Sequence, residues 1–201
     1  MTNSNKVIST QLNDHENGHK RIADHCGAVY FITGATGLMA SEFLAQVLKS
    51  DPTAECILLV RASDQAKAET KVDSLVSYLF PDTSTNASYR TRTHAVIGDM
   101  SLSKMGLREE DWEWVIQNTH YILHAAALTD WGADIEIATH VNINGVSEII
   151  NLACACCSNL RKLLQISTAY VSADKTGPIS PDDLYEDYSP CDNYQLTKRQ
   201  G

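Results

Sequence analysis

Three side chains in the later part of the sequence have the types and spacing for acid catalysis at a carbonyl group. Tyr194 and Lys198 lie four residues apart, so they share one face if this segment is helical. A neighbouring ammonium group lowers the pKa of a phenol from its ordinary value of about 10. The phenol can then protonate or hydrogen-bond the oxyanion that forms when hydride reaches a carbonyl carbon, and Thr168 offers a second donor. We predict that Thr168, Tyr194 and Lys198 are catalytic, with Lys198 also holding a nicotinamide ribose; a chance surface pair is the alternative.

A glycine turn near the start of the sequence has the spacing of a dinucleotide site. Gly34 permits a tight turn after a buried strand, and Gly37 lets the backbone approach a pyrophosphate at the N-terminus of the next helix. Ala40 stands where a third glycine is usual and is small enough for close helix–strand packing. A glycine pattern alone is weak evidence. Its place between a strand and a helix favours nucleotide binding over a mere turn.

The end of the next predicted strand carries a basic residue that distinguishes the two nicotinamide cofactors. A site that prefers NAD usually has Asp or Glu here to bind the ribose 2′-hydroxyl. Arg61 stands there instead, and a guanidinium group suits the 2′-phosphate of NADP(H). A solvated surface arginine is the alternative. We therefore predict NADP(H) as the cofactor.

The ends of two further predicted strands complete the nucleotide site. Asp99 can accept a hydrogen bond from the adenine amino group, and Met100 can pack on the ring. The small side chains at 125–127, all alanine, leave room for the dinucleotide. His124 precedes them, and we interpret it as a residue packed in the sheet rather than as a catalytic base.

These residues are positioned by short apolar strands that alternate with helices. We predict strands at 28–33, 56–60, 94–97, 121–124 and 163–167, and a loop at 81–93. One helix follows the glycine turn and ends before Asp51, and others are expected at 64–79, 109–118 and 134–157. Such alternation predicts a doubly wound, Rossmann-type α/β fold with a parallel sheet covered on both faces. Ligands bind at the carboxyl ends of such strands, where the residues above lie.

Composition excludes several other classes of protein. A formal net charge of −9 argues against a nucleic-acid partner. No apolar run approaches the length of a transmembrane segment, and residues 1–26 lack the apolar core of a signal peptide. We predict a disordered tail at 1–26 and an NADP-binding domain at 27–201. The cysteines show no disulfide framework, which favours free thiols in the cytoplasm. Those at 154, 156 and 157 have helical spacing, so we interpret them as small apolar residues and predict no metal site.

Four stretches give the sequence a narrower family resemblance. They are 58–62; 98–102 with 105–107 and 110–112; 124–131; and 141–145. The chain resembles extended short-chain dehydrogenases/reductases over about residues 28–201. More closely it is similar to thioester reductases, which include male-sterility-type fatty acyl reductases and the terminal reductase domains of carboxylic acid reductases and nonribosomal peptide synthetases.

The resemblance implies a reaction and assigns roles to residues. Thr168, Tyr194 and Lys198 match the catalytic trio, and Asn142 matches an asparagine that organises a helix and a water network. The residues matched to cofactor binding are Gly34, Thr36, Gly37, Leu38, Arg61, Asp99, Met100, Ala125, Ala126, Ala127, Tyr194 and Lys198. The implied reaction is hydride transfer from NADPH to an acyl thioester on coenzyme A or a carrier protein. It yields an aldehyde, and a second hydride would yield an alcohol.

The length of the sequence departs from the family pattern and leaves two alternatives open. Family members continue into a C-terminal substrate-binding part, so we expect this chain to be a truncated portion that is inactive by itself. A sugar-nucleotide epimerase or dehydratase shares the Thr/Tyr/Lys trio but usually favours NAD. A non-catalytic NADP-binding regulatory module would need no intact Tyr194 and Lys198.

Overall fold

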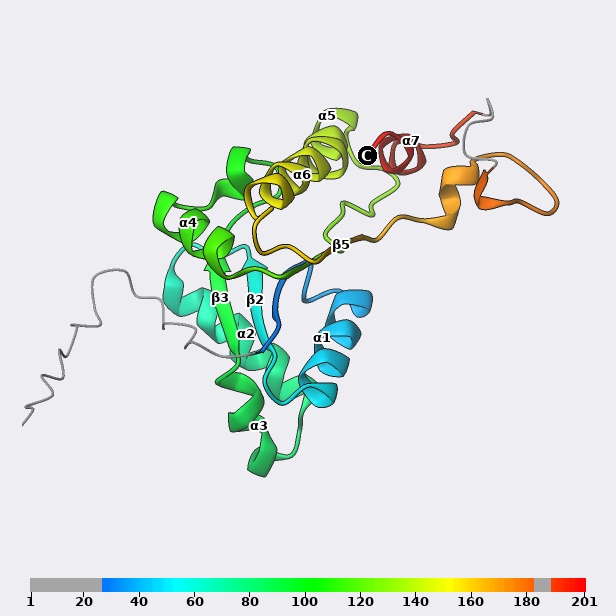
Figure 1. Ribbon diagram of the computed structural model, residues 1–201. Helices are drawn as coiled ribbons and strands as arrows, with labels where there is room; N and C mark the ends of the chain where they lie inside the picture. Colours follow the sequence, from blue (N-terminus) through cyan, green and yellow to red (C-terminus); the bar gives the residue numbers. More distant parts are fainter. Residues whose placement is uncertain (1–26, 183–188) are drawn as a thin grey trace, which may run out of the picture.

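The structure is a computed structural model that describes residues 27–182 and 189–201 (Figure 1). The predicted N-terminal tail lies outside these residues. Within them, no helix is long and apolar enough to cross a membrane. The same residues contain no group of three or more His, Cys, Asp or Glu side chains placed to hold a metal ion.

A parallel sheet of five strands forms the centre of the fold, in the order β3-β2-β1-β4-β5. The strands are β1 (Val29–Thr33), β2 (Glu55–Val60), β3 (Thr93–Ile97), β4 (Tyr121–His124) and β5 (Lys162–Gln165). The order reverses between β1 and β4, and a crevice opens at such a point beyond the carboxyl ends of the strands. The prediction of a doubly wound parallel sheet is confirmed.

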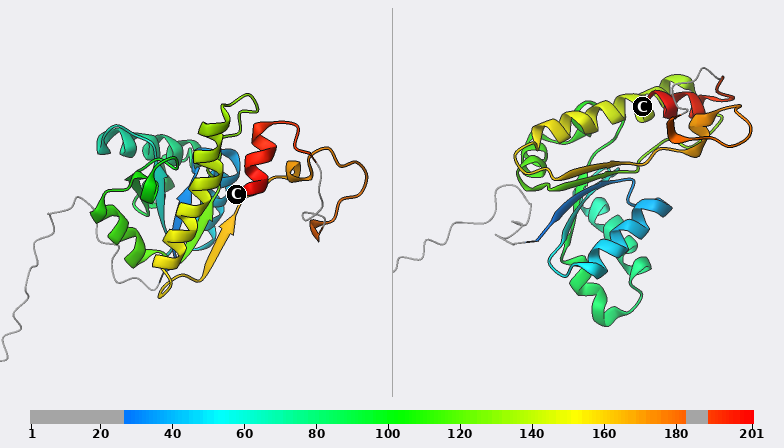
Figure 2. Two further views of the ribbon diagram at one scale, coloured as in Figure 1. Left: turned by 90° about the horizontal axis from the view of Figure 1, so that it is seen from above. Right: turned by 45° about the vertical axis from the view of Figure 1, so that its right-hand side comes forward.

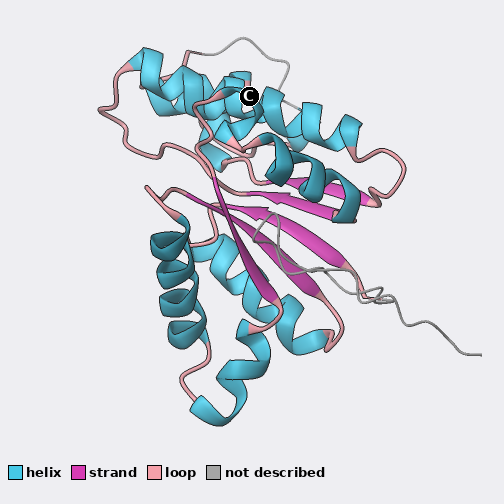
Figure 3. Cartoon of the chain, turned by 90° about the vertical axis from the view of Figure 1, so that its left-hand side faces the viewer, coloured by secondary structure: helices cyan, strands magenta, loops and turns pink. Residues whose placement is uncertain are grey.

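Helices cover both faces of this sheet (Figures 2 and 3). One layer comprises α1 (Leu38–Ser50), α2 (Gln65–Leu79) and α3 (Thr83–Arg90). The other contains α4 (Glu109–Asn118), α5 (Ile135–Thr139), the π-helical turn η2 (His140–Asn144), α6 (Gly145–Ala155) and α7 (Asn193–Gln200). Two short 3₁₀ turns, η1 (Ser103–Gly106) and η3 (Ala169–Ser172), follow β3 and β5.

The strands are apolar at nearly every position because helices cover both faces of the sheet. Along β1, Tyr30 and Ile32 pack with the α1–α2 layer, whereas Val29 and Phe31 pack with the α4–α6 layer. Every residue of β2 is buried. A strand that is buried on both faces needs apolar residues at successive positions, which is the pattern the sequence shows.

Two segments differ from the predicted elements. The predicted loop at 81–93 contains α3, which begins where the carboxylate of Asp82 accepts a hydrogen bond from the amide of Ser84. No residue of α3 is buried, so it lacks the apolar periodicity that reveals a helix in sequence. The predicted helix at 134–157 is interrupted by the π-helical turn η2.

The cysteines of α6 and the turn after it also differ in part from their predicted role. Cys156 is buried, as a small apolar residue would be, and burial raises the pKa of its thiol to about 11. Cys154 and Cys157 are exposed, because they lie on the solvent side of the helix end. All three thiols are free.

Candidate active site

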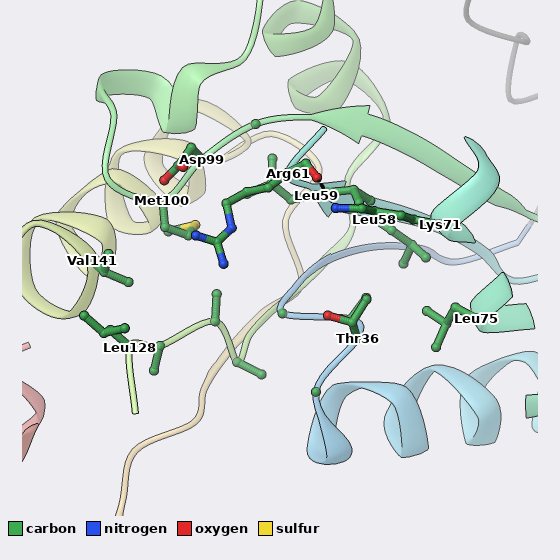
Figure 4. Close-up of a pocket in the computed structure, with 18 of the residues that line it drawn as sticks. Thr36, Leu58, Leu59, Arg61, Lys71, Leu75, Asp99, Met100, Leu128 and Val141 are labelled. Carbon is green, nitrogen blue, oxygen red and sulfur yellow. Dashed lines mark hydrogen bonds between the residues drawn. The ribbon is translucent and has the colours of Figure 1, made fainter. Parts of the chain in front are cut away.

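A cavity of about 410 Å³ lies at the carboxyl ends of β1, β2, β3 and β4 (Figure 4). Most of the side chains predicted to bind a cofactor line it: Gly34, Thr36, Gly37, Arg61, Asp99, Met100, Ala125, Ala126 and Ala127. Arg61, Asp99 and Met100 lie on one side, and Thr36 lies across from them. Four residues of the predicted site, Leu38, Thr168, Tyr194 and Lys198, lie outside the lining. Leu38 is the first residue of α1 and is 77% exposed to solvent.

Gly34 brings the end of β1 into close contact with the end of β4. Its φ angle is +72°, and a Cβ atom there would lie 2.7 Å from the backbone nitrogen of Ala126. Gly37 then serves as the N-cap of α1 without a side-chain hydrogen bond. The first amides of α1 are therefore available to an anion. Ala40 is buried in the core, as close packing requires.

His124 and Thr33 are both buried beneath this turn. Thr33 Oγ1 shares a hydrogen bond of 2.7 Å with His124 Nδ1, and it accepts another from the amide of Ala126 at 3.2 Å. Burial, with a smaller effect of the charge on Lys198, lowers the pKa of His124 to about 4. The imidazole is therefore neutral at pH 7 and is packed in the sheet, as the sequence analysis predicted.

Two cations lie at the end of β2. Arg61 is exposed and lines the cavity, and Lys71 of α2 lines it beside Arg61. The Nζ atom of Lys71 donates a hydrogen bond of 2.6 Å to the carbonyl oxygen of Arg61. Sequence analysis missed Lys71. The spacing of Ala68 and Val72 could have indicated it. Both are buried one helical turn apart, and this places Lys71 beside the inner face of α2.

Asp99 presents a carboxylate on the same side of the cavity. Its Oδ1 atom accepts hydrogen bonds from the amide of Ser101 at 2.9 Å and from its hydroxyl at 2.7 Å. Within the described part of the chain, its Oδ2 atom accepts none. Partial burial opposes ionisation, but the Ser101 hydrogen bonds and the charge of Arg61 outweigh it and lower the pKa of Asp99. The carboxylate is therefore ionised and can accept a hydrogen bond from a ligand.

Helix α7 carries Tyr194 and Lys198, so the segment is helical as expected. It begins where the carboxylate of Asp192 accepts a hydrogen bond of 2.8 Å from the amide of Gln195. Lys198 is 6% exposed, and its Nζ atom donates a hydrogen bond of 2.9 Å to the carbonyl oxygen of Ile166, just beyond β5. Burial lowers the pKa of Lys198. This contact brings α7 to the segment of Thr168, whose Oγ1 accepts from the amide of Tyr170 at 3.2 Å.

Asn142 joins the loop after β4 to α7. It lies in the π-helical turn and is 2% exposed. Its Oδ1 atom accepts from the amide of Leu128 at 2.8 Å, and its Nδ2 atom donates to the carbonyl oxygen of Leu128 and to Thr197 Oγ1, each at 3.0 Å. Thr197 precedes Lys198 in α7, so Asn142 organises the helix that carries the predicted catalytic pair.

The strand order, the glycine turn at the reversal point and the cavity beside it define a Rossmann-type nucleotide-binding domain. The family model described as "Male sterility protein" matches residues 32–200. The chain therefore belongs to the male sterility protein family.

The chain is similar to proteins of three kinds. "Fatty acyl-CoA reductase wat" of Drosophila melanogaster is 26% identical over 173 residues, which are 77% of this chain and 33% of that protein. The chain thus spans about a third of the length of this relative. The terminal R domain from the myxalamid PKS-NRPS biosynthetic pathway superposes with a TM-score of 0.72 at 22% identity, covering 86% of this chain and 43% of that one. The ADP-L-glycero-D-manno-heptose-6-epimerase of Helicobacter pylori superposes with a TM-score of 0.60 at 16% identity, covering 90% of this chain and 52% of that one. These two likenesses concern the fold alone.

Proposed function

We propose that this chain binds NADP(H) and carries the hydride-transfer site of an NADPH-dependent reductase of acyl thioesters. The observation that carries the proposal is the position of Lys198, whose ammonium group is held at the end of β5 near Thr168. The relatives named as fatty acyl-CoA reductases support the choice of an acyl thioester. The carrier of the acyl group is coenzyme A or a carrier protein.

The residues of the cavity fit a dinucleotide with a 2′-phosphate. The turn at Gly34 leaves no space for a Cβ atom, and the open amides at the start of α1 suit a pyrophosphate. Arg61 and Lys71 would neutralise the 2′-phosphate, and Asp99 Oδ2 would accept from the adenine amino group. NADPH supplies the hydride when it is bound.

The residues beyond β5 act on the oxygen of the thioester. Tyr194 and Thr168 would donate hydrogen bonds to this oxygen, and these bonds strengthen as negative charge develops on it. Tyr194 then delivers a proton to give a hemithioacetal, which loses the thiol to leave an aldehyde. Lys198 is desolvated, and its charge would act on the phenol and on the nicotinamide ribose.

The reaction is tested in a full-length version of the protein, by following NADPH oxidation and aldehyde formation with an acyl-CoA substrate. Tyr194→Phe should lower the rate by about 100-fold or more, because general acid catalysis contributes about 10²–10⁴-fold. The affinity for 2′,5′-ADP should be unchanged, since Tyr194 lies outside the lining of the cavity. An unchanged rate would contradict the mechanism. Cofactor binding without any thioester reduction would favour the non-catalytic module instead.

The cofactor is tested by comparing the affinities of the 201-residue chain for NADPH and NADH. Arg61→Ala and Lys71→Ala should each weaken NADPH by about tenfold or more, as expected for loss of a hydrogen bond to a charged group, and weaken NADH little. Lys67→Ala is the matched control, because Lys67 lies one turn earlier on α2 and outside the cavity lining. Equal losses for the two cofactors would refute the 2′-phosphate assignment. Purified protein that retains bound NAD would favour the epimerase or dehydratase reading.

A further inference from the structure

Three consecutive residues in the loop between β3 and α4 have left-handed backbone conformations. The φ angles are +48° at Lys104, +55° at Met105 and +63° at Gly106. Glycine adopts this conformation freely, but a residue with a Cβ atom is strained in it. The turn at Lys104 and Met105 therefore persists only because other contacts hold it.

Helix α6 holds this loop at two points. The Oε2 atom of Glu148 accepts a hydrogen bond of 2.8 Å from the backbone amide of Lys104. One turn earlier, Gly145 packs against Met100, where an added Cβ atom would lie 3.2 Å from both the Cε and the carbonyl oxygen of that methionine. The side chain of Met105 is fully buried in the apolar cluster that also contains Ile149 of α6.

The strained turn is connected directly to the carboxylate in the cavity. The carbonyl oxygen of Met105 accepts a hydrogen bond of 2.7 Å from the amide of Asp99. Gly98 adjoins the same carbonyl, since a Cβ atom there would lie 2.5 Å from it. A change in the peptide planes at 104–106 would therefore move Asp99, which lines the cavity on the same side as Arg61.

We infer that Glu148 is a positioning residue for the adenine end of the cofactor. Its carboxylate stabilises the left-handed turn at Lys104, and the turn fixes Asp99 and Met100 against the adenine. Glu148 itself does not line the cavity, so it acts only through the loop. The inference rests on the proposed binding of NADP(H), but it concerns the origin of affinity at one end of that site.

The first test measures the affinity for 2′,5′-ADP, which carries the adenine and the 2′-phosphate but no nicotinamide. Glu148→Ala should weaken this ligand by about tenfold, which corresponds to about 1.4 kcal/mol. Glu148→Gln keeps an oxygen acceptor and should weaken it by less than about threefold. Glu109→Ala is the matched control, because Glu109 pairs with the side chain of the same lysine, Nζ to Oε2 at 2.8 Å, and leaves its amide untouched.

A second test compares the affinities for two cofactors that differ only in the adenine amino group. A purely structural role of Glu148 would leave the ratio of these two affinities unchanged. The unmodified chain should bind NADPH more tightly than its deamino analogue, in which an oxygen replaces the adenine amino group, because Asp99 accepts from that group. Glu148→Ala should bring the two affinities closer to equality, as Asp99→Ala should. A ratio that falls for Asp99→Ala but not for Glu148→Ala would overturn the inference.

Rescue at Lys104 distinguishes strain in the turn from general damage. Lys104→Gly removes the strain that Glu148 opposes, so Glu148→Ala in this background should weaken 2′,5′-ADP by less than about threefold. This comparison also serves if Glu148→Ala alone does not fold. A tenfold loss in the Lys104→Gly background, or an effect of Glu109→Ala equal to that of Glu148→Ala, would overturn the inference. Failure of the unmodified chain to bind 2′,5′-ADP would instead contradict the proposed function.

Discussion

The side chain of Asn142 gives the sharpest test of how α7 is held in place. Asn142→Ala removes three hydrogen bonds, two to the backbone of Leu128 and one to Thr197. At about 1 kcal/mol for each bond, the free energy of unfolding should fall by about 3 kcal/mol. With an m value of about 2 kcal/mol/M, the midpoint in urea should fall by about 1.5 M with no change in m. The midpoint is measured by circular dichroism.

The matched variant is Thr197→Val, which removes only one of these bonds. Thr197 Oγ1 also donates to the carbonyl oxygen of Asn193 at 2.7 Å, a bond within α7 that does not involve Asn142. We expect a loss of about 2 kcal/mol for Thr197→Val, because both its bond with Asn142 and its bond to Asn193 are lost, and a coupling energy of about 1 kcal/mol with Asn142→Ala in a double-mutant cycle. A coupling energy near zero, or a loss below about 1 kcal/mol for Asn142→Ala, would refute the view that this side chain anchors α7.

Two further predictions concern the glycine turn at Gly34 and the buried imidazole of His124. Gly34→Ala should destabilise the fold by about 2 kcal/mol or more in urea unfolding, since the left-handed conformation alone costs about 1–2 kcal/mol. Gly132→Ala, where a Cβ atom would meet only Asp130 Oδ1 at 3.6 Å, should change stability by less than about 0.5 kcal/mol; equal effects would contradict the strain at Gly34. Because burial lowers the pKa of His124 from 6.5 to about 4, the unfolded chain binds the proton more readily than the folded chain. Stability should therefore be complete above about pH 6.5 and fall by about 3 kcal/mol toward pH 4, a loss that is absent in His124→Gln; parallel pH profiles would exclude His124 as its cause.

The features that could be predicted from sequence are those determined by local pattern. Apolar runs revealed the strands because both faces of the sheet are covered, as at Phe31 and Ile32. The glycine turn could be placed because Gly34 must adopt a positive φ angle between a strand and a helix. Cavity-lining residues such as Arg61 and Asp99 were found because side chains at the carboxyl ends of parallel strands converge on one edge.

The features that sequence did not reveal depend on contacts between distant segments. The left-handed turn at Lys104 and Met105 is held by Glu148, which lies on another helix, and nothing in the residue types at 104–105 indicates it. The π-helical turn contains Asn142, whose partners are Leu128 and Thr197. Propensity and periodicity describe neither kind of contact, because both act within a single element.

The two halves of the site are held by different forces. The cofactor half is built on strand ends whose side chains pack in two apolar clusters. Helix α7 instead buries Gln195, Thr197 and Lys198, so polar contacts fix its position, including the bond of Lys198 to Ile166 and that of Asn193 Nδ2 to the carbonyl oxygen of Ala133 at 3.0 Å. Segments that bury few apolar groups open at a lower free energy than core strands do. Loss of a hydrogen bond to α7 should therefore impair the proposed catalytic half of the site before it weakens binding of the adenine half.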